Sequence, residues 1–201
     1  MVGYMSLEEQ VDADFSCARR RASFRRLMAR LRRDPTLVAP PCFGEVSEAL
    51  GARGGGVRLG LRTVPTERIA GSVGRCSEFD EAFMPIRAGT EERWKRIDRV
   101  FYGAKELPPV SLYKIGGSYF VLDGNHRVSV YRYHGVKWVD AYVTEFGARS
   151  GLGSAFLPTA QRAPDGTTPN EEDDGSLSPV VCSELSAGTT GAVDAQPGQG
   201  V

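Results

Sequence analysis

Apolar side chains recur with a helical period over residues 6–34. Ser6 followed three residues later by Glu9 is a capping box, and Pro35 ends the segment because proline disfavours a helical conformation in the residue before it. The apolar stripe changes face midway, from Leu7, Val11, Phe15, Ala18 and Ala22 to Phe24, Leu27, Met28 and Leu31. The pattern predicts one long helix whose two halves present different apolar faces.

Shorter apolar runs alternate with turn residues between positions 57 and 147. Thr90 can cap a helix that starts at Glu91, and Gly116-Gly117 joins two apolar runs as a hairpin turn. We predict strands at 57–64, 110–115, 118–122 and 138–144, and helices at 45–50, 77–83, 91–102 and 125–134. These elements define a small α/β domain, in which a mixed β-sheet has helices packed on it.

Composition divides the chain into three parts. Residues 1–56 form a helical basic arm with a Gly-rich linker, residues 57–147 form the α/β domain, and residues 148–201 form an acidic tail rich in Gly, Pro, Ser and Thr. The tail has few large apolar residues to offset the entropy of ordering, so we expect it to be disordered. The formal net charge is +0, but the local balance is +6 for residues 12–33 and −6 for residues 150–201.

The Arg-rich segment 19–33 has two interpretations. Four arginines share one face of its helix: Arg19, Arg26, Arg30 and Arg33. They either bind the phosphates of a nucleic acid or solvate a helix that docks through Leu27 and Leu31. Because the whole chain is neutral, the solvated face is favoured.

The cysteine spacing and the lengths of the apolar runs indicate in which cellular compartment the protein is expected. The four cysteines are scattered without a Cys-x-x-Cys pair, so neither a zinc knuckle nor a disulfide framework is predicted: Cys17, Cys42, Cys76 and Cys182. We expect free, reduced thiols in a cytoplasmic protein. The N-terminus has no apolar signal-peptide segment, and no apolar run approaches the roughly 20 residues of a membrane span. No membrane partner is expected.

Residues 117–135 have the features of a ligand site. An apolar run ends at Asp123-Gly124, and a short helix then opens with Asn125, His126 and Arg127. A glycine turn from a strand into a helix presents free N–H groups at the positive end of the helix dipole, which attracts phosphate. Arg127 adds a planar charged group suited to phosphate oxygens. The alternative is structural: Asp123 caps the helix, and His126 and Arg127 are solvated.

A four-residue motif, Gly124 to Arg127, resembles the conserved-sequence box of ParB-like N-terminal domains. In this chain a predicted strand leads into the motif, and a helix of small residues follows it. That superfamily includes chromosome-partitioning clamps that bind CTP, sulfiredoxins, and ADP-dependent free serine kinases. Further matching segments lie upstream in the family's order: Val64–Ile69, Arg75 followed by Phe79-Asp80, and Leu107–Tyr113. The resemblance covers residues 57–147 and implies a stand-alone bacterial member of the ParB/sulfiredoxin superfamily.

Positions at which this sequence differs from the family's pattern exclude some of the family's functions. Asn125 stands where sulfiredoxins have their nucleophilic cysteine, and an amide cannot replace a thiolate, so that chemistry is excluded. Only a polar tail follows Phe146, where a partitioning clamp continues with a helix-turn-helix region. A DNA-binding partitioning protein or a nuclease is therefore the least favoured function.

We predict a regulatory module that binds a phosphorylated small molecule. The resemblance implies CTP or ADP/ATP with Mg²⁺ as the nucleotide. The predicted binding residues are Gly124, Asn125, His126, Arg127 and Arg75. The alternative is a phosphotransferase similar to the serine kinases, with these catalytic residues: Asp123, His126 and Glu67. Such an enzyme needs a second acid or base near His126, and Glu67 and Glu145 are the two carboxylates considered.

Overall fold

The computed structural model describes residues 5–32, 40–52 and 54–147, which all belong to one compact unit, Met1–Asn170. Its helices are α1 (Leu7–Arg32), α2 (Phe43–Ala49), α3 (Glu91–Tyr102) and α4 (Asn125–Tyr133), with short 3₁₀ helices η2 (Thr66–Arg68) and η3 (Ala88–Thr90). Its strands are β1 (Val57–Pro65), β2 (Ile69–Ser72), β3 (Val110–Ile115), β4 (Ser118–Asp123) and β5 (Trp138–Phe146). The predicted tail, residues 148–201, lies outside the described residues.

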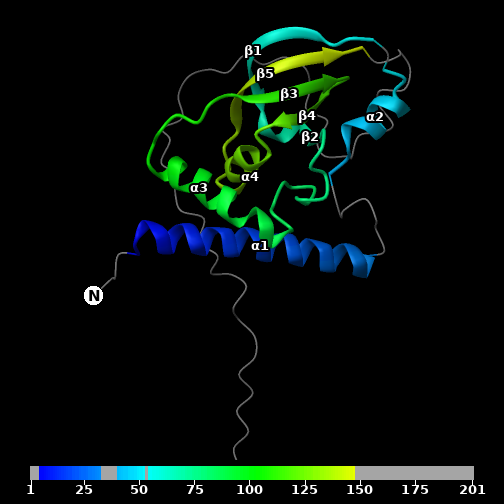
Figure 1. Cartoon of the computed structure of the whole chain (residues 1–201). Helices are drawn as coiled ribbons and strands as arrows, with labels where there is room; N and C mark the ends of the chain where they lie inside the picture. Colours follow the sequence, from blue (N-terminus) through cyan, green and yellow to red (C-terminus); the bar gives the residue numbers. More distant parts are fainter. Residues whose placement is uncertain (1–4, 33–39, 53, 148–201) are drawn as a thin grey trace, which may run out of the picture. The chain divides into compact units, whose positions relative to one another are not determined.

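The strands form one mixed sheet in the order β1-β5-β3-β4-β2 (Figure 1). The pairs β1–β5 and β3–β4 are antiparallel, whereas β3–β5 and β2–β4 are parallel. One face of the sheet packs against α4 through a buried cluster that includes Leu112, Val121, Val128 and Val139. The predicted fold class, a small mixed β-sheet with packed helices, is confirmed.

Helix α2 belongs to a second cluster that buries Phe120 of β4 together with Val46 and Leu50. Since successive side chains of a strand point to opposite faces, Phe120 lies across the sheet from Val121. Both faces of the sheet are therefore covered in part by helices.

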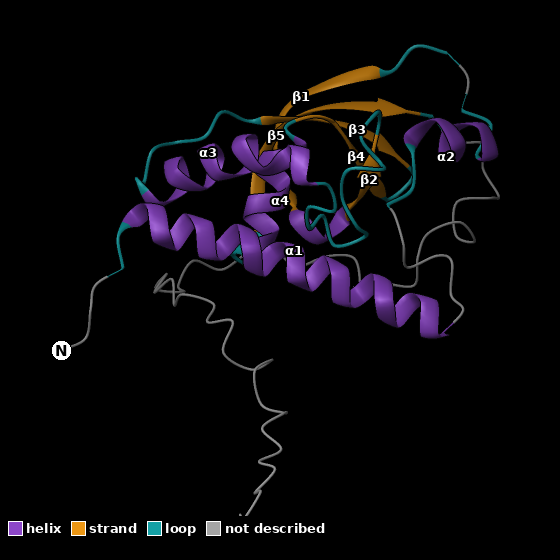
Figure 2. Cartoon of the chain, turned by 60° about the horizontal axis from the view of Figure 1, so that its bottom comes forward, coloured by secondary structure: helices purple, strands orange, loops and turns teal. Residues whose placement is uncertain are grey.

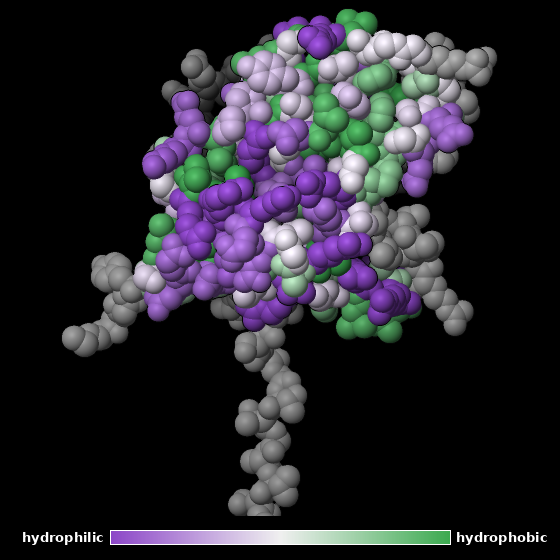
Figure 3. All heavy atoms as spheres, viewed as in Figure 1, coloured by the Kyte–Doolittle hydropathy of each residue, from purple (hydrophilic) through white to green (hydrophobic). Residues whose placement is uncertain are grey.

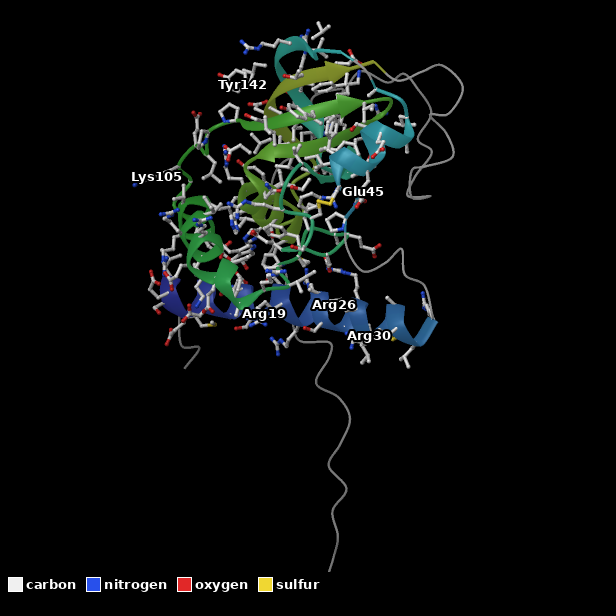
Figure 4. All side chains as sticks on the ribbon, turned by 45° about the vertical axis from the view of Figure 1, so that its right-hand side comes forward. Arg19, Arg26, Arg30, Glu45, Lys105 and Tyr142 are labelled. Atoms are coloured by element: carbon white, nitrogen blue, oxygen red, sulfur yellow. A yellow bond between two sulfur atoms is a disulfide. The ribbon has the colours of Figure 1, made fainter. Side chains whose placement is uncertain are left out.

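The prediction of free thiols is wrong. Cys42, which precedes α2, forms a disulfide with Cys76 in the loop after β2 (Figure 4), and none of the cysteines in the described residues is free. An isolated β-bridge between the backbones of Cys42 and Ser72 holds the two loops side by side. The Cα atoms of Cys42 and Cys76 are 5.6 Å apart, which suits a disulfide. Spacing in the sequence gives no sign of this approach, because the cysteines are 34 residues apart. Disulfides are typical of oxidising compartments, so the cytoplasmic location stays a prediction without its main support.

Helix α1 packs against α3 (Figure 2). The predicted capping box is confirmed: the backbone N–H of Ser6 donates to the Glu9 carboxylate at 2.7 Å, and the N–H of Glu9 donates to Ser6 Oγ at 3.3 Å. Phe15 is 3% exposed and lies against the fully buried Trp94, with ring centroids 5.6 Å apart. Helix α1 thus contributes buried side chains to the packing against α3.

The docking face of α1 differs from the one considered from the sequence. Leu27 and Leu31 are 55% and 69% exposed, so the helix does not dock through them. Arg25 instead forms an ion pair with the buried Asp80 at 2.8 Å, and Arg21 lies 5.1 Å above the ring of Tyr133. Part of the Arg-rich segment therefore serves the fold, and its binding to nucleic acid stays a prediction. Figure 4 marks three further arginines along α1: Arg19, Arg26 and Arg30.

The predicted helix at 77–83 is wrong. The segment forms turns around Asp80, whose carboxylate accepts hydrogen bonds from the N–H groups of Ala82 and Met84 at 3.0 and 2.8 Å. These local bonds replace helical ones. Phe83 has a positive φ of 60°, which a helix does not allow. Phe79 and Phe83 are both fully buried in the core.

Candidate anion-binding site

The site is built at the junction of β4 and α4. Gly124 has φ 98°, in the left-handed region, and occupies the N-cap position. A Cβ atom at Gly124 would lie 2.7 Å from Val110 Cγ1, so both the conformation and the space require glycine. The first helical bond runs from the N–H of Val128 to the carbonyl of Gly124. The N–H groups of the three preceding residues therefore sit at the positive end of the helix.

Asp123 and Arg127 are paired with each other. Asp123 is not the N-cap; it accepts a hydrogen bond from Arg127 Nη2 at 2.7 Å. Arg127 Nη1 donates to the carbonyls of Pro108 and Pro109, and only 12% of its side chain is exposed. The guanidinium thus holds the entry of β3 against the start of α4. The solvated alternative does not describe Arg127, because its side chain is largely buried.

Three arginines from outside the four-residue box surround the start of α4. Arg75, Arg93 and Arg96 line a pocket of about 220 Å³ together with Asn125 and His126 and with the residues of the strand-to-helix turn. Arg93 and Arg96 come from the face of α3 that is turned to α4, and within the described residues no hydrogen bond or ion pair joins either guanidinium to another group. Their spacing, i and i+3, placed them on one helical face in the sequence, but nothing there showed that this face meets α4.

A second pocket of about 350 Å³ continues from the first and is lined by Glu78, Arg87, Gly89 and Thr90. The two pockets share Arg75, Arg93 and His126. Arg75 is partly neutralised, because its Nη1 donates to both carboxylate oxygens of Glu78 at 3.0 Å. In Figure 3 hydrophilic residues gather over the face formed by α3 and α1. The combined site is strongly basic.

Two polar side chains at the site have buried atoms without a partner. Asn125 is 5% exposed, and its Oδ1 accepts no hydrogen bond from the described residues. Both ring nitrogens of His126 are likewise buried and unpaired there. Burial lowers the pKa of His126 to about 4, and the ring lies edge-on to Phe79. Unsatisfied buried polar atoms at a pocket wall are what a missing ligand or water would satisfy.

The two other carboxylates considered from the sequence lie elsewhere. Glu67 is exposed and lines a separate pocket of about 540 Å³ beside Arg25 and Arg132. Glu145 is on β5 and forms an ion pair with Lys114 at 2.8 Å. The carboxylate that does approach His126 is Glu78, which sequence reasoning did not single out.

Comparison with known proteins adds one likeness. No protein-family model and no curated protein matches the chain. The solved structure of sulfiredoxin from Arabidopsis thaliana is similar at 15% identity and a TM-score of 0.33, over 43% of this chain and 86% of that one. Within the described part of the chain, no helix has the length and apolar character needed to cross a membrane.

Proposed function

We propose that this chain binds a phosphorylated small molecule at the start of α4 and acts as a binding or regulatory module. The observation that carries the proposal is the convergence of Arg75, Arg93 and Arg96 on the free N–H groups of the first turn of α4. Guanidinium groups and helix N-termini are the two protein features that best stabilise phosphate oxygens. Asp123, the acid at this pocket, is already paired with Arg127.

Binding is favoured over phosphoryl transfer. A catalytic base must present its acceptor atom to the reacting group, whereas both ring nitrogens of His126 are buried. Asp123 is engaged by Arg127, and Glu67 lies at another pocket. Glu78 is held by Arg75. These contacts support a module whose ligand is held and not converted.

More specifically, we propose that the phosphorylated ligand is a nucleotide. The second pocket extends the site past Thr90, which leaves room for a sugar or base beyond a phosphate at α4. The side chain of Asp123 is 76% exposed, which leaves lone pairs available to a nucleotide-bound Mg²⁺. The choice among CTP, ADP and ATP, and the need for Mg²⁺, are part of what the experiment determines.

The test is calorimetric titration of the full chain with inorganic pyrophosphate, CTP, ADP and ATP, each with and without Mg²⁺. The double variant Arg93→Ala/Arg96→Ala should lose at least tenfold in affinity, because each removes a charged contact worth about 1.5–3 kcal/mol. The matched control is Arg58→Ala/Arg62→Ala, which removes two exposed arginines of β1 and should leave affinity unchanged. Equal losses in both variants, or no binding by the wild type, contradict the proposal.

A further inference from the structure

A buried cluster of titratable groups lies apart from the anion-binding site. Asp14 of α1, Asp98 of α3 and His134 at the end of α4 each offer one ligand atom, and these atoms lie within 4.8 Å of one another. The three residues come from three helices that are far apart in the sequence (Figure 2). The fold therefore assembles an O, O, N donor set in its interior.

Within the part of the chain that the structure describes, His134 is the one basic side chain paired with the carboxylates of this cluster. Asp98 is fully buried and Asp14 is 5% exposed. His134 forms the ion pair to Asp98, at 2.7 Å, and within the described residues no lysine or arginine pairs with either carboxylate. If both carboxylates are ionised, their charge exceeds that of one imidazolium, and an unbalanced buried charge is costly in a medium of low polarity.

One oxygen of the cluster has no partner. Asp98 Oδ1 accepts from His134, but Asp98 Oδ2 is buried and makes no hydrogen bond to any described residue. A buried carboxylate oxygen without a donor needs a cation, a proton or a water. This orphan atom belongs to the same cluster and gives independent support for a missing positive charge.

The surrounding groups hold the donor set in position. The hydroxyls of Tyr102 and Tyr133 donate to Asp14 at 2.6 and 2.9 Å, and Gln10 Nε2 donates to it at 3.0 Å. The ring of Phe101 stacks on His134 with centroids 4.3 Å apart. Metal ligands are commonly oriented in this way by outer hydrogen bonds and packing.

We propose that Asp14, Asp98 and His134 bind one divalent transition-metal cation, Zn²⁺ being the best match, which joins α1 to α3 and α4. Two carboxylates and a neutral imidazole balance a charge of 2+, and nitrogen with oxygen is a donor set that Zn²⁺ accepts at about 2.0–2.2 Å. The cation takes the place of the proton between His134 Nε2 and Asp98, and that proton passes to solvent. Occupancy of this site is independent of phosphate binding.

The test uses Zn²⁺ alone on the untagged, chelator-treated full chain. Equilibrium dialysis followed by elemental analysis should give one zinc per chain, and a pH-stat titration should show protons released as zinc binds. Zinc should also raise the melting temperature of the wild type, because the cation binds the native state preferentially. Mg²⁺, which prefers six oxygens, should give neither effect.

Variants then locate the site. Asp98→Asn and His134→Gln should each lose at least tenfold in zinc affinity, whereas Asp12→Asn should retain it, since Asp12 is an exposed acid of α1 that pairs with Lys95. Circular dichroism establishes that the variants fold. If a variant does not fold, the zinc stoichiometry and the proton release of the wild type still test the proposal. Absence of bound zinc in the wild type, or retention by both ligand variants, overturns the proposal and leaves a proton shared within the cluster.

Discussion

Asp123 and Arg127 bind each other across the first turn of α4, with Nη2 and Oδ2 2.7 Å apart. The arginine that the sequence offered as the main phosphate ligand is thereby occupied by its own neighbour and by two backbone carbonyls. The charge available to a ligand comes from α3 and from the loop after β2. In the proposed site, the structural role thus falls to Arg127 and the binding role to other arginines of the same pocket.

Arg127→Ala should destabilise the fold. The change leaves the carbonyls of Pro108 and Pro109 without their donor, and we expect a loss of about 2–3 kcal/mol in the free energy of unfolding. Urea denaturation followed by circular dichroism measures it. Arg96→Ala is the matched control and should change stability by less than about 0.5 kcal/mol, because Arg96 is exposed. Similar stabilities for the two variants would show that Arg127 is not structural.

The packing of α1 gives a second prediction. Phe15→Ala empties a site beside Trp94 and should cost about 3–5 kcal/mol, whereas Phe24→Ala, at a position 50% exposed on the same helix, should cost about 0.5 kcal/mol or less. Thermal unfolding of both variants in one buffer checks the difference. If the two variants melt at the same temperature, Phe15 of α1 does not pack in the core in solution.

The disulfide should contribute substantially to stability. Opening a loop of this length, 34 residues, by the double change Cys42→Ala/Cys76→Ala should cost about 3–4 kcal/mol by loss of the constraint on the unfolded chain. Denaturant unfolding without reductant measures the effect while leaving Cys17 unchanged. An unfolding free energy equal to that of the wild type would mean that the two cysteines are not joined in solution.

His126 should make stability depend on pH. Its pKa is lowered to about 4 by burial first, with Arg75, Arg93 and Arg96 acting in the same direction and Glu78 opposing them. Because the native state then binds the proton less readily than the unfolded chain, the free energy of unfolding should fall as the pH falls from 6.5 to about 4. His126→Gln should remove this part of the slope in urea titrations at several pH values. A slope that the variant keeps must arise from other groups.

Local sequence signals predicted most elements but few contacts. Ser6 with Glu9 fixed the start of α1, and the bounds of α3 and β3 follow from their apolar periods and the glycine and proline residues around them. The turn at Asp80 escaped prediction because a side chain, and not the local propensity, supplies its hydrogen bonds. Strand β2 was missed as well, since it is four residues long.

In the candidate site, too, local features could be predicted from the sequence, whereas contacts between elements could not. Gly124 was recognisable because a strand-to-helix turn needs a residue that tolerates positive φ. The approach of Arg93 and Arg96 to that turn depends on how α3 packs against α4, and no local pattern encodes it. Nor did spacing show that Cys42 and Cys76 meet, or that Asp98 faces His134.

The most direct test of the central claim is a ¹H–¹⁵N correlation titration of the full chain with inorganic pyrophosphate. The largest amide shifts should fall on Asn125, His126 and Arg127, whose N–H groups open α4, and should be absent in Arg93→Ala/Arg96→Ala. Saturation of these shifts at one ligand per chain is the predicted result. Shifts centred instead on the pocket of Arg25 and Arg132, or no saturable shifts at all, would contradict an anion site at the start of α4.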